Sequence, residues 1–467
     1  MWERFSYYGM RALLVLFMVD QVGKGGLGLT SEMATAIYGL YTAAVYLAAL
    51  PGGWIADRFL GAQKSVWYGG IIIAAGQFTL AFSRGDTFFL GLVLVVFGTG
   101  LLKPNVSAIV GELYPEGGAR RDAGFTIFYM GINLGAAIGP LISAALGEKM
   151  NWHYGFGAAG VGMVLGLIQY RFTVVNLGDA GLLPGRRGRV TTRDWGLLTV
   201  LLGTAVAAVG LVFTGVVRVN PLALAQGTAY VIVGVAVLYF VAAFLCFGLD
   251  ATEKKRLTVI GVLFISSALF WSGFEQAGSS LNLFAKLFTQ RVYFGYEIPA
   301  GWFQSLGPVC IITLAPVMAA LWLALARRGW EPSLSAKFGW GLLLLGAGFL
   351  VMAGASKLAA SGHKVLPLWL IFTYLLHSFG ELCLSPVGLS SVTKLAPKRL
   401  VGQMMGIWFL ATSLGSLIAG LVAGELGAAT GEQMAARYLQ IVLMAVGAGG
   451  LLLILTKPVK SLMAGVR

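Results

Sequence analysis

The chain has 467 residues, of which 58% are hydrophobic and 11% are charged, and its formal net charge is +14. Soluble domains carry about a quarter charged residues, so this composition excludes an ordinary water-soluble fold. Apolar stretches of about 20 residues, the length that crosses a bilayer as a helix, recur from end to end. They are continuously apolar rather than alternating, which excludes a membrane β-barrel. The sequence therefore predicts an all-α integral membrane protein.

The apolar stretches predict fourteen transmembrane helices in chain order. We expect them near residues 1–22, 33–56, 63–82, 87–111, 122–146, 152–170, 195–217, 222–248, 257–288, 301–326, 338–356, 366–393, 401–424 and 438–456. Because the first stretch carries charges and aromatic residues, it is predicted to be a working helix rather than a cleavable signal peptide.

The order of helices and polar segments predicts three parts. Residues 1–172 form an amino-terminal six-helix bundle and residues 257–467 form a carboxyl-terminal one. Residues 173–256 form a linker with the basic run 185–189, followed by two inserted helices that are nearly free of interior charge. Two bundles moving about a central site are typical of transporters built from repeated halves. The inserted pair is predicted to serve packing rather than transport.

Basic residues are distributed unevenly among the loops. With the amino terminus inside the cell, lysines and arginines concentrate in the segments that would face the cytoplasm, for example Arg58, Lys64, Lys255 and Lys457. The positive-inside rule therefore places both termini of this multi-pass protein in the cytoplasm. Topology and the lipid bilayer explain the net charge, and no nucleic-acid partner is expected.

Cysteine and histidine are scarce. Cys246, Cys310 and Cys383 all fall in apolar segments without metal-ligand or disulfide spacing, so buried thiols acting as small hydrophobic side chains are predicted. With three histidines in the chain, neither a metal cluster nor a nucleophile–base pair is recognisable. An integral-membrane enzyme, the rival of a different class, is thereby disfavoured, and we expect no cofactor and no metal site.

Several ionisable residues fall inside predicted membrane helices, where a charge at the bilayer centre is unfavourable by about 2.5–3.5 kcal/mol on insertion scales. Arg4, Tyr8 and Arg11 share one face of the first helix. Cations in the first half and acids in the second predict a polarised site that suits a substrate with both an ammonium and a carboxylate. The ionisable residues are Glu3, Arg4, Arg11, Lys103, Glu275 and Glu381.

Structural roles remain open for each of these charges. Glu3 and Arg4 would be interfacial residues, and Lys103 would extend its ammonium toward the helix end near Glu112. Glu275 and Glu381 would pair with an arginine or with backbone groups. A structural role and a transport role are compatible, because a gate is a salt bridge that must break.

Residues 52–64, GGWIADRFLGAQK, separate the second and third predicted helices. Glycine permits close helix approach, and Asp57 and Arg58 are able to cap neighbouring helix ends. The string resembles the loop motif of the major facilitator superfamily, whereas a short basic turn would explain only Arg58 and Lys64.

Five further strings are WERFSYYGMR at 2–11, LKPNVS at 102–107, FYMGINLG at 128–135, FWSGFEQAGSS at 270–280 and GELCLSPVGLS at 380–390. They resemble motifs of the proton-dependent oligopeptide transporter family, in the expected order along nearly the whole chain. Each motif alone is moderately specific, and the five together are a strong indication. The resemblance implies a major facilitator fold with two six-helix bundles plus an inserted pair, as in bacterial members.

The resemblance also implies a function, which is uptake of di- and tripeptides driven by protons. Arg11 and Lys103 would hold the peptide carboxylate, Glu381 its ammonium, and Asn133 its backbone. Further substrate contacts would come from Tyr7, Tyr8, Tyr46, Trp271, Ser385 and Trp408. Glu3, paired with Lys103 or Arg4, and Glu275, paired with Arg11, would carry protons. Without the resemblance, Tyr46 and Trp408 are equally well explained as packing residues.

The sequence departs from the family pattern at two places. The family's first motif has an additional glutamate that would precede Met1, so this acid is either missing from the given chain or absent from this member. Gly307-Pro308 stands where many members have Asn-Pro, which removes one polar ligand for the peptide ammonium.

Proton coupling is expected to rest on carboxylates rather than on histidine. His153 and His363 fall in predicted outer loops, and His377, one turn before Glu381, is better explained by packing. A carboxylate holds its proton more weakly beside a cation than in apolar surroundings, so breaking a salt bridge changes proton affinity. The nearest rivals are proton-linked carriers of nitrate, amino acids or drugs, and a monomer is the expected state.

Overall fold

The computed structural model describes residues 1–82, 85, 87–114, 118–183, 190–330, 332–427 and 430–463. In this part of the chain nearly all regular structure is helical, and the remainder is one short antiparallel hairpin. The basic run of the predicted linker at 185–189 lies outside the described residues. The chain folds into two compact units, Met1–Leu13 with Ala44–Leu224, and Leu14–Ala43 with Ala225–Arg467.

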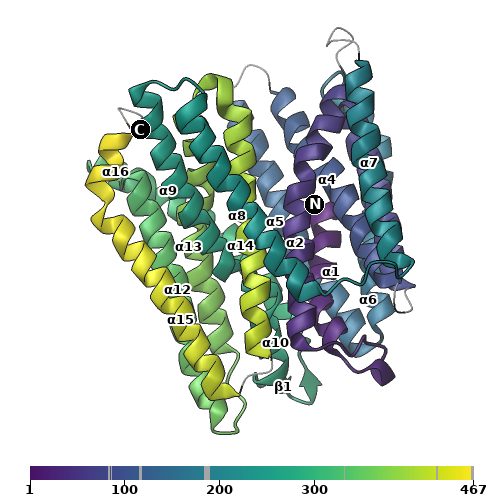
Figure 1. Ribbon diagram of the computed structural model, residues 1–467. Coiled ribbons are helices and arrows are strands. Elements are labelled where there is room, and N and C mark those ends of the chain that lie inside the picture. The colour runs from purple at the N-terminus through teal and green to yellow at the C-terminus, as the bar shows by residue number, and fades with distance from the viewer. Residues whose placement is uncertain are drawn as a thin grey trace. The chain divides into compact units, whose positions relative to one another are not determined.

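Unit 1 contains the first part of α1, the second part of α2, and the helices up to α7 (Figure 1). The elements that lie wholly or partly in unit 1 are α1 (Trp2–Val19), α2 (Ser31–Ile55), the π-turn Ala56–Leu60, α3 (Gly61–Ala81), α4 (Thr87–Glu112), α5 (Gly118–Lys149), α6 (Trp152–Thr173), the 3-10 turn Val174–Leu177 and α7 (Thr192–Phe213).

Unit 2 contains the remaining parts of α1 and α2 and nearly all of the chain from α8 onward, with α12 and α15 running side by side in Figure 1. Its elements are the 3-10 turn Val22–Lys24, α8 (Pro221–Cys246), α9 (Ala251–Phe274), the 3-10 turn Glu275–Gly278, α10 (Ser280–Leu287), β1 (Val292–Tyr293), β2 (Tyr296–Glu297), the 3-10 turn Ala300–Ser305, α11 (Leu306–Arg327), α12 (Leu334–Ala360), α13 (Leu368–Leu395), the 3-10 turn Lys398–Leu400, α14 (Val401–Gly427), α15 (Gly431–Ile454) and α16 (Thr456–Leu462).

Twelve stretches of described residues are long and apolar enough to cross a membrane. One of them, Ser31–Ala81, covers both α2 and α3, and α1 is not among them because it carries Glu3, Arg4 and Arg11. Counting α2 and α3 separately and adding α1 gives the fourteen spans predicted from hydropathy, which confirms the helix number.

Small residues allow the helices of unit 1 to pack closely. A Cβ atom at Gly69 of α3 would lie 2.7 Å from the carbonyl oxygen of Gly98 in α4, and a Cβ at Gly98 would lie 2.6 Å from that of Gly69. Real Cβ atoms do not approach a backbone oxygen this closely, so neither position accepts a larger residue without separating the two helices. Mutual close packing of this kind, through small residues, is how membrane helices associate without a hydrophobic driving force.

The loop string at residues 52–64 is held inside unit 1. Gly61 has φ +74°, and a Cβ there would lie 2.7 Å from the backbone nitrogen of Leu183, so glycine is required on both grounds. Arg58 lies 4.0 Å from the carboxylate of Asp194 at the start of α7, and the ring of Phe59 meets that of Trp195 edge-on at 5.1 Å. Arg58 thus contacts a helix start, as the sequence suggested for this loop.

The predicted continuous helix at 257–288 is interrupted in the structure. α9 ends at Phe274, a 3-10 turn covers Glu275–Gly278, and α10 resumes at Ser280. The turn ends in Gly278, which forms helices poorly, and Ser279 lies outside helical backbone geometry. Hydropathy gave no sign of the break because the apolar pattern continues through it.

Two smaller expectations were wrong. Of the three cysteines expected to be buried, Cys383 is buried, Cys310 is half-buried, and Cys246 is exposed at the end of α8. His153 lies in the first turn of α6 rather than in a loop, where Asn151 caps the helix by accepting a hydrogen bond from the His153 backbone nitrogen.

Candidate functional site

The first half of α1 positions the charged cluster of unit 1. A Cβ at Gly135 of α5 would lie 2.2 Å from the Met1 carbonyl oxygen, and one at Gly139 would lie 2.4 Å from that of Phe5. On α6, a Cβ at Gly166 would meet the side chain of Trp2 at 2.7 Å. These glycines bring the α1 backbone against α5 and α6, so the position of the Glu3–Arg11 segment is set by backbone contact.

Glu3 and Arg4 form a fork-to-fork ion pair. Arg4 Nε and Nη2 both donate to the Glu3 carboxylate, the second bond measuring 2.5 Å. Both side chains are largely buried, and two-point pairing is the strong arrangement for a guanidinium and a carboxylate. The sequence left Lys103 and Arg4 as possible partners of Glu3, and the structure records an ion pair with Arg4.

Aromatic rings surround the cations of this cluster. The guanidinium carbon of Arg4 lies 5.2 Å from the ring centre of Tyr7, and that of Arg11 lies 5.6 Å from that of Tyr8. Lys103 places its ammonium 3.8 Å above the ring of Tyr46. Cation–π contacts of this kind stabilise a desolvated cation by up to about 2 kcal/mol. The predicted substrate-contacting tyrosines thus lie beside the predicted cations.

A cavity of about 270 Å³ in unit 1 is lined by Glu3, Arg4 and Lys103 together. Charged side chains of the first and fourth helices therefore line one cavity, which is compatible with the predicted pairing of Glu3 with Lys103 or Arg4. Its remaining walls are mostly apolar and include Ser107 and Tyr170. The sequence motifs singled out neither residue for a role, although Ser107 stands one turn after Lys103 on the same helix face.

Asn133 is buried on α5, and its side-chain amide donates to the carbonyl oxygen of Tyr129 at 3.0 Å. This bond uses one of the two protons on the Asn133 side-chain nitrogen, and the side-chain oxygen takes no part in it. Arg11 is also buried, with 4% of its surface exposed. Its predicted partner Glu275 belongs to unit 2, so that pair stays a prediction.

Glu275 lies at the break between α9 and α10 and is 3% exposed. The hydroxyl of Tyr38 donates to its backbone carbonyl oxygen at 3.4 Å. One turn earlier, Trp271 lies against α14, where a Cβ at Gly415 would come 2.6 Å from the Trp271 Cβ. The interruption of the helix thus fixes a buried carboxylate where the backbone is irregular, a geometry associated with ion and substrate sites in transporters.

The other predicted residues of unit 2 lie on α13 and α14. Glu381 and Ser385 are half-buried, one helical turn apart on α13. His377, the turn before, is buried between the rings of Phe349 and Phe274, at 4.9 and 6.5 Å. This packing agrees with the interpretation of His377 as a packing residue.

Trp408 lies within the packing of unit 2. It is buried, meets the ring of Phe338 at 6.3 Å, and covers Gly388, where a Cβ would lie 2.3 Å from the indole. Among the described residues, no group of three or more histidine, cysteine or carboxylate side chains is arranged to hold a metal ion.

Comparison with known proteins identifies the family. A model described as the POT family matches residues 63–441, which is most of the chain. The chain belongs to the POT family. A peptide transporter from Yersinia enterocolitica is 44% identical to this chain, and the match covers 99% of this chain and 93% of that protein. A di-/tripeptide transporter from Lactococcus lactis subsp. cremoris is 36% identical, and the match covers 100% of this chain and 95% of that protein.

Solved structures of POT transporters have the same fold. A crystal structure of a peptide transporter POT with sulfate superposes with a TM-score of 0.91 at 41% identity, covering 99% of this chain and 94% of that one. A complex of a mutant of such a transporter with alafosfalin superposes with a TM-score of 0.91 at 40% identity and has the same coverage. These matches confirm the predicted major facilitator fold, and the chain is a multi-pass membrane transporter of the bacterial POT family.

Proposed function

We propose that this chain imports di- and tripeptides together with protons by alternating access. The observation that carries the proposal is similarity over the whole chain to relatives named as peptide transporters. We further propose that protons are the coupling ion, that no other cofactor takes part, that the protein is not an enzyme, and that it works as a monomer.

The charges within each unit support a substrate with two charged ends. The cavity of unit 1 is lined by two cations and one carboxylate, so a peptide carboxylate would balance its charge. Unit 2 offers the carboxylates of Glu275 and Glu381, which suit an ammonium. We propose that Arg11 and Lys103 bind the peptide carboxylate, that Glu381 binds its ammonium, and that Glu3 and Glu275 carry protons.

Capping either end of a dipeptide is expected to weaken its competition for transport. Removing one partner of a desolvated charge pair weakens binding by about 2–5 kcal/mol, and 2 kcal/mol corresponds to roughly a 30-fold rise in the inhibition constant. The measurement is inhibition of labelled dipeptide uptake into sealed vesicles by free, amino-capped, carboxyl-capped and doubly capped dipeptides. Equal inhibition by the free and doubly capped forms would favour a carrier of drugs or other non-peptides.

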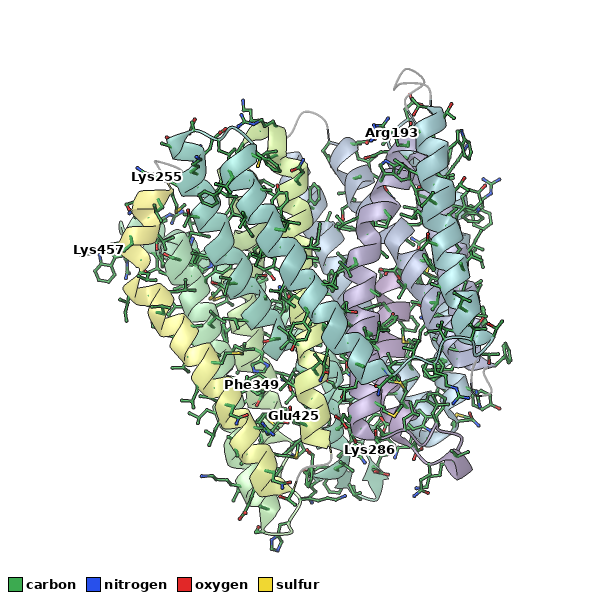
Figure 2. The ribbon with its side chains drawn as sticks, in the orientation of Figure 1. Arg193, Lys255, Lys286, Phe349, Glu425 and Lys457 are labelled. Carbon is green, nitrogen blue, oxygen red and sulfur yellow. The ribbon has the colours of Figure 1, made fainter. Side chains whose placement is uncertain are left out.

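We propose a bacterial inner-membrane location with both termini in the cytoplasm. In unit 2, Lys255 and Lys457 lie toward one end, and Lys286 and Glu425 lie toward the other (Figure 2). The excess of lysines and arginines in the segments predicted to face the cytoplasm supports this orientation under the positive-inside rule.

A reporter fused at the carboxyl terminus is expected to give a cytoplasmic signal, and so is one fused after Asp194 at the start of α7. The paired measurement uses alkaline phosphatase, which is active outside, and green fluorescent protein, which is fluorescent inside. A fusion after Phe294, in the β1–β2 turn, provides the matched external control. Phosphatase activity at either of the first two sites would reverse the topology.

A further inference from the structure

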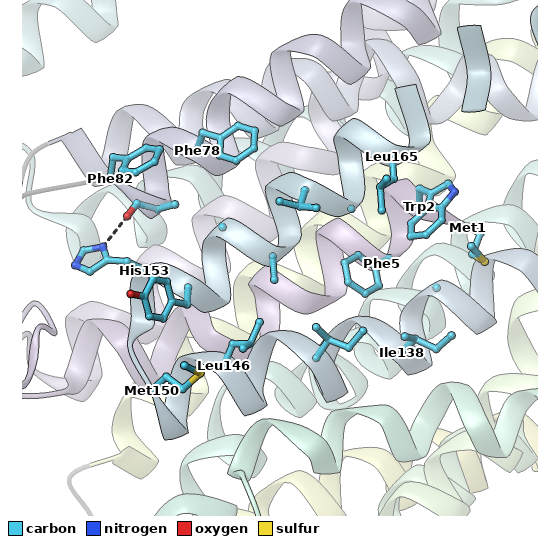
Figure 3. A pocket seen from close by; sticks show the side chains of 18 residues that line it. Met1, Trp2, Phe5, Phe78, Phe82, Ile138, Leu146, Met150, His153 and Leu165 are labelled. Carbon is cyan, nitrogen blue, oxygen red and sulfur yellow. Dashed lines mark hydrogen bonds between the residues drawn. The ribbon is translucent and has the colours of Figure 1, made fainter. Parts of the chain in front are cut away.

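A long apolar groove lies on unit 1 beside the charged cavity, with which it shares Met1 and Trp2 as lining residues. It has a volume of about 1100 Å³ and is formed by α1, α3, α5 and α6 (Figure 3). Its walls are apolar side chains such as Phe5, Phe78, Ile142 and Val161. Ile142 and Val161 are also exposed on the outside of the unit. The groove is therefore open to whatever surrounds the helices.

The groove lies at membrane depth. Its walls include α5 and α6, which belong to the apolar spans Gly124–Lys149 and Trp152–Leu177. On α6 it extends from His153 to Leu165, and twelve residues at 1.5 Å each give a length of about 18 Å. One leaflet of a bilayer has about 15 Å of hydrocarbon. The groove thus runs from the end of the span to mid-membrane, the depth that the acyl chains of one leaflet occupy.

The two ends of the groove differ in polarity. At the α5–α6 turn, Tyr154 and Lys149 are exposed, and His153 lies beside them with Nδ1 bonded to the carbonyl oxygen of Ala81 at 2.7 Å. Since a carbonyl only accepts, Nδ1 carries the proton and the ring is held in place at the mouth (Figure 3). Tyrosine and lysine at a span end are typical of the lipid headgroup level.

We propose that this groove is a binding site for one phospholipid, whose acyl chains fill the apolar groove and whose phosphate lies at the α5–α6 turn near Lys149. Water does not fill such a space, because an apolar cavity offers it no hydrogen bonds. The apolar wall continues into the exposed face of α6, so bilayer lipid reaches the groove directly. The lipid would stay bound when the surrounding annular lipid exchanges.

Gly157 on α6 gives a direct test, because it lines the groove and a Cβ there would contact only Ala81 Cβ at 3.9 Å. Gly157→Leu is therefore expected to fill the groove without moving a helix. Gly203→Leu, on exposed α7 where a Cβ meets nothing within 4 Å, adds the same side chain outside the groove. Ala158→Leu, also lining the groove, is a second filling variant.

The measurement is native mass spectrometry of the detergent-purified protein titrated with phosphatidylglycerol, together with the lipid-dependent shift of its unfolding temperature. Wild type and Gly203→Leu are expected to retain one tightly bound lipid and to show the shift. Gly157→Leu and Ala158→Leu are expected to lose both while importing dipeptide normally. Lys149→Gln should keep a bound lipid but lose a preference for phosphatidylglycerol over phosphatidylcholine. Equal lipid retention by the filled variants and wild type would overturn the proposal and leave annular lipid only.

Discussion

Lys103→Ala is expected to abolish dipeptide uptake driven by a pH gradient. Lys103 lines the same cavity as the Glu3–Arg4 pair and holds its ammonium over the ring of Tyr46. In our proposal the incoming peptide carboxylate binds this ammonium and alters the electrostatic balance at Glu3. A carboxylate in apolar surroundings keeps its proton more firmly when a neighbouring cation is removed. The variant would therefore lose a substrate contact and one of the two cations that line the cavity together with Glu3.

Uptake against an imposed pH gradient, normalised to the amount of protein in the vesicles, measures this effect. We expect Lys103→Ala to fall to the level of empty vesicles. Lys103→Arg keeps the charge but changes the donor geometry, so it should restore only part of the activity. Lys357→Ala removes an exposed lysine from the last turn of α12 and should behave as wild type. Wild-type accumulation by the Lys103→Ala variant would reduce Lys103 to a packing residue.

Glu275→Gln is expected to separate proton coupling from substrate exchange. Glutamine keeps the size and hydrogen-bonding capacity of the side chain but cannot carry a proton. Glu275 is buried at the break between α9 and α10, where the Tyr38 hydroxyl contacts its backbone carbonyl. Since the substitution leaves that backbone contact available, the local fold should persist. Proton-driven accumulation should be lost, whereas exchange of internal for external peptide requires no net proton movement and should continue.

Two assays on the same vesicle preparation distinguish these processes. Accumulation is measured under an inward pH gradient, and counterflow is measured with equal pH and unlabelled peptide inside. Glu425→Gln is the matched control, because Glu425 is an exposed acid paired with Arg437 at 3.0 Å near the end of α14. Accumulation by Glu275→Gln equal to that of wild type would remove Glu275 from the coupling mechanism. Loss of both activities would instead assign it to substrate binding or to the fold.

The sequence by itself determined the fold class, the helix number and the family. A membrane span is a local property, since about 20 consecutive apolar residues suffice to recognise it. Charges inside such spans are equally visible, which is why Arg11, Lys103 and Glu275 stand out in the sequence alone. The spacing of Arg4 and Arg11 placed both on one face of the first helix for the same reason.

Only the tertiary structure decided which of these charges meet and where the backbone departs from a regular helix. It paired Glu3 with Arg4, brought Lys103 to the same cavity, and buried Trp408 against Gly388. It also broke the helix at Glu275 and shaped the groove between α1, α3, α5 and α6. These features depend on contacts between residues that are far apart in the chain, and especially on glycines that let helix backbones touch. A hydropathy pattern records how apolar each segment is, but it does not record which segment lies beside it.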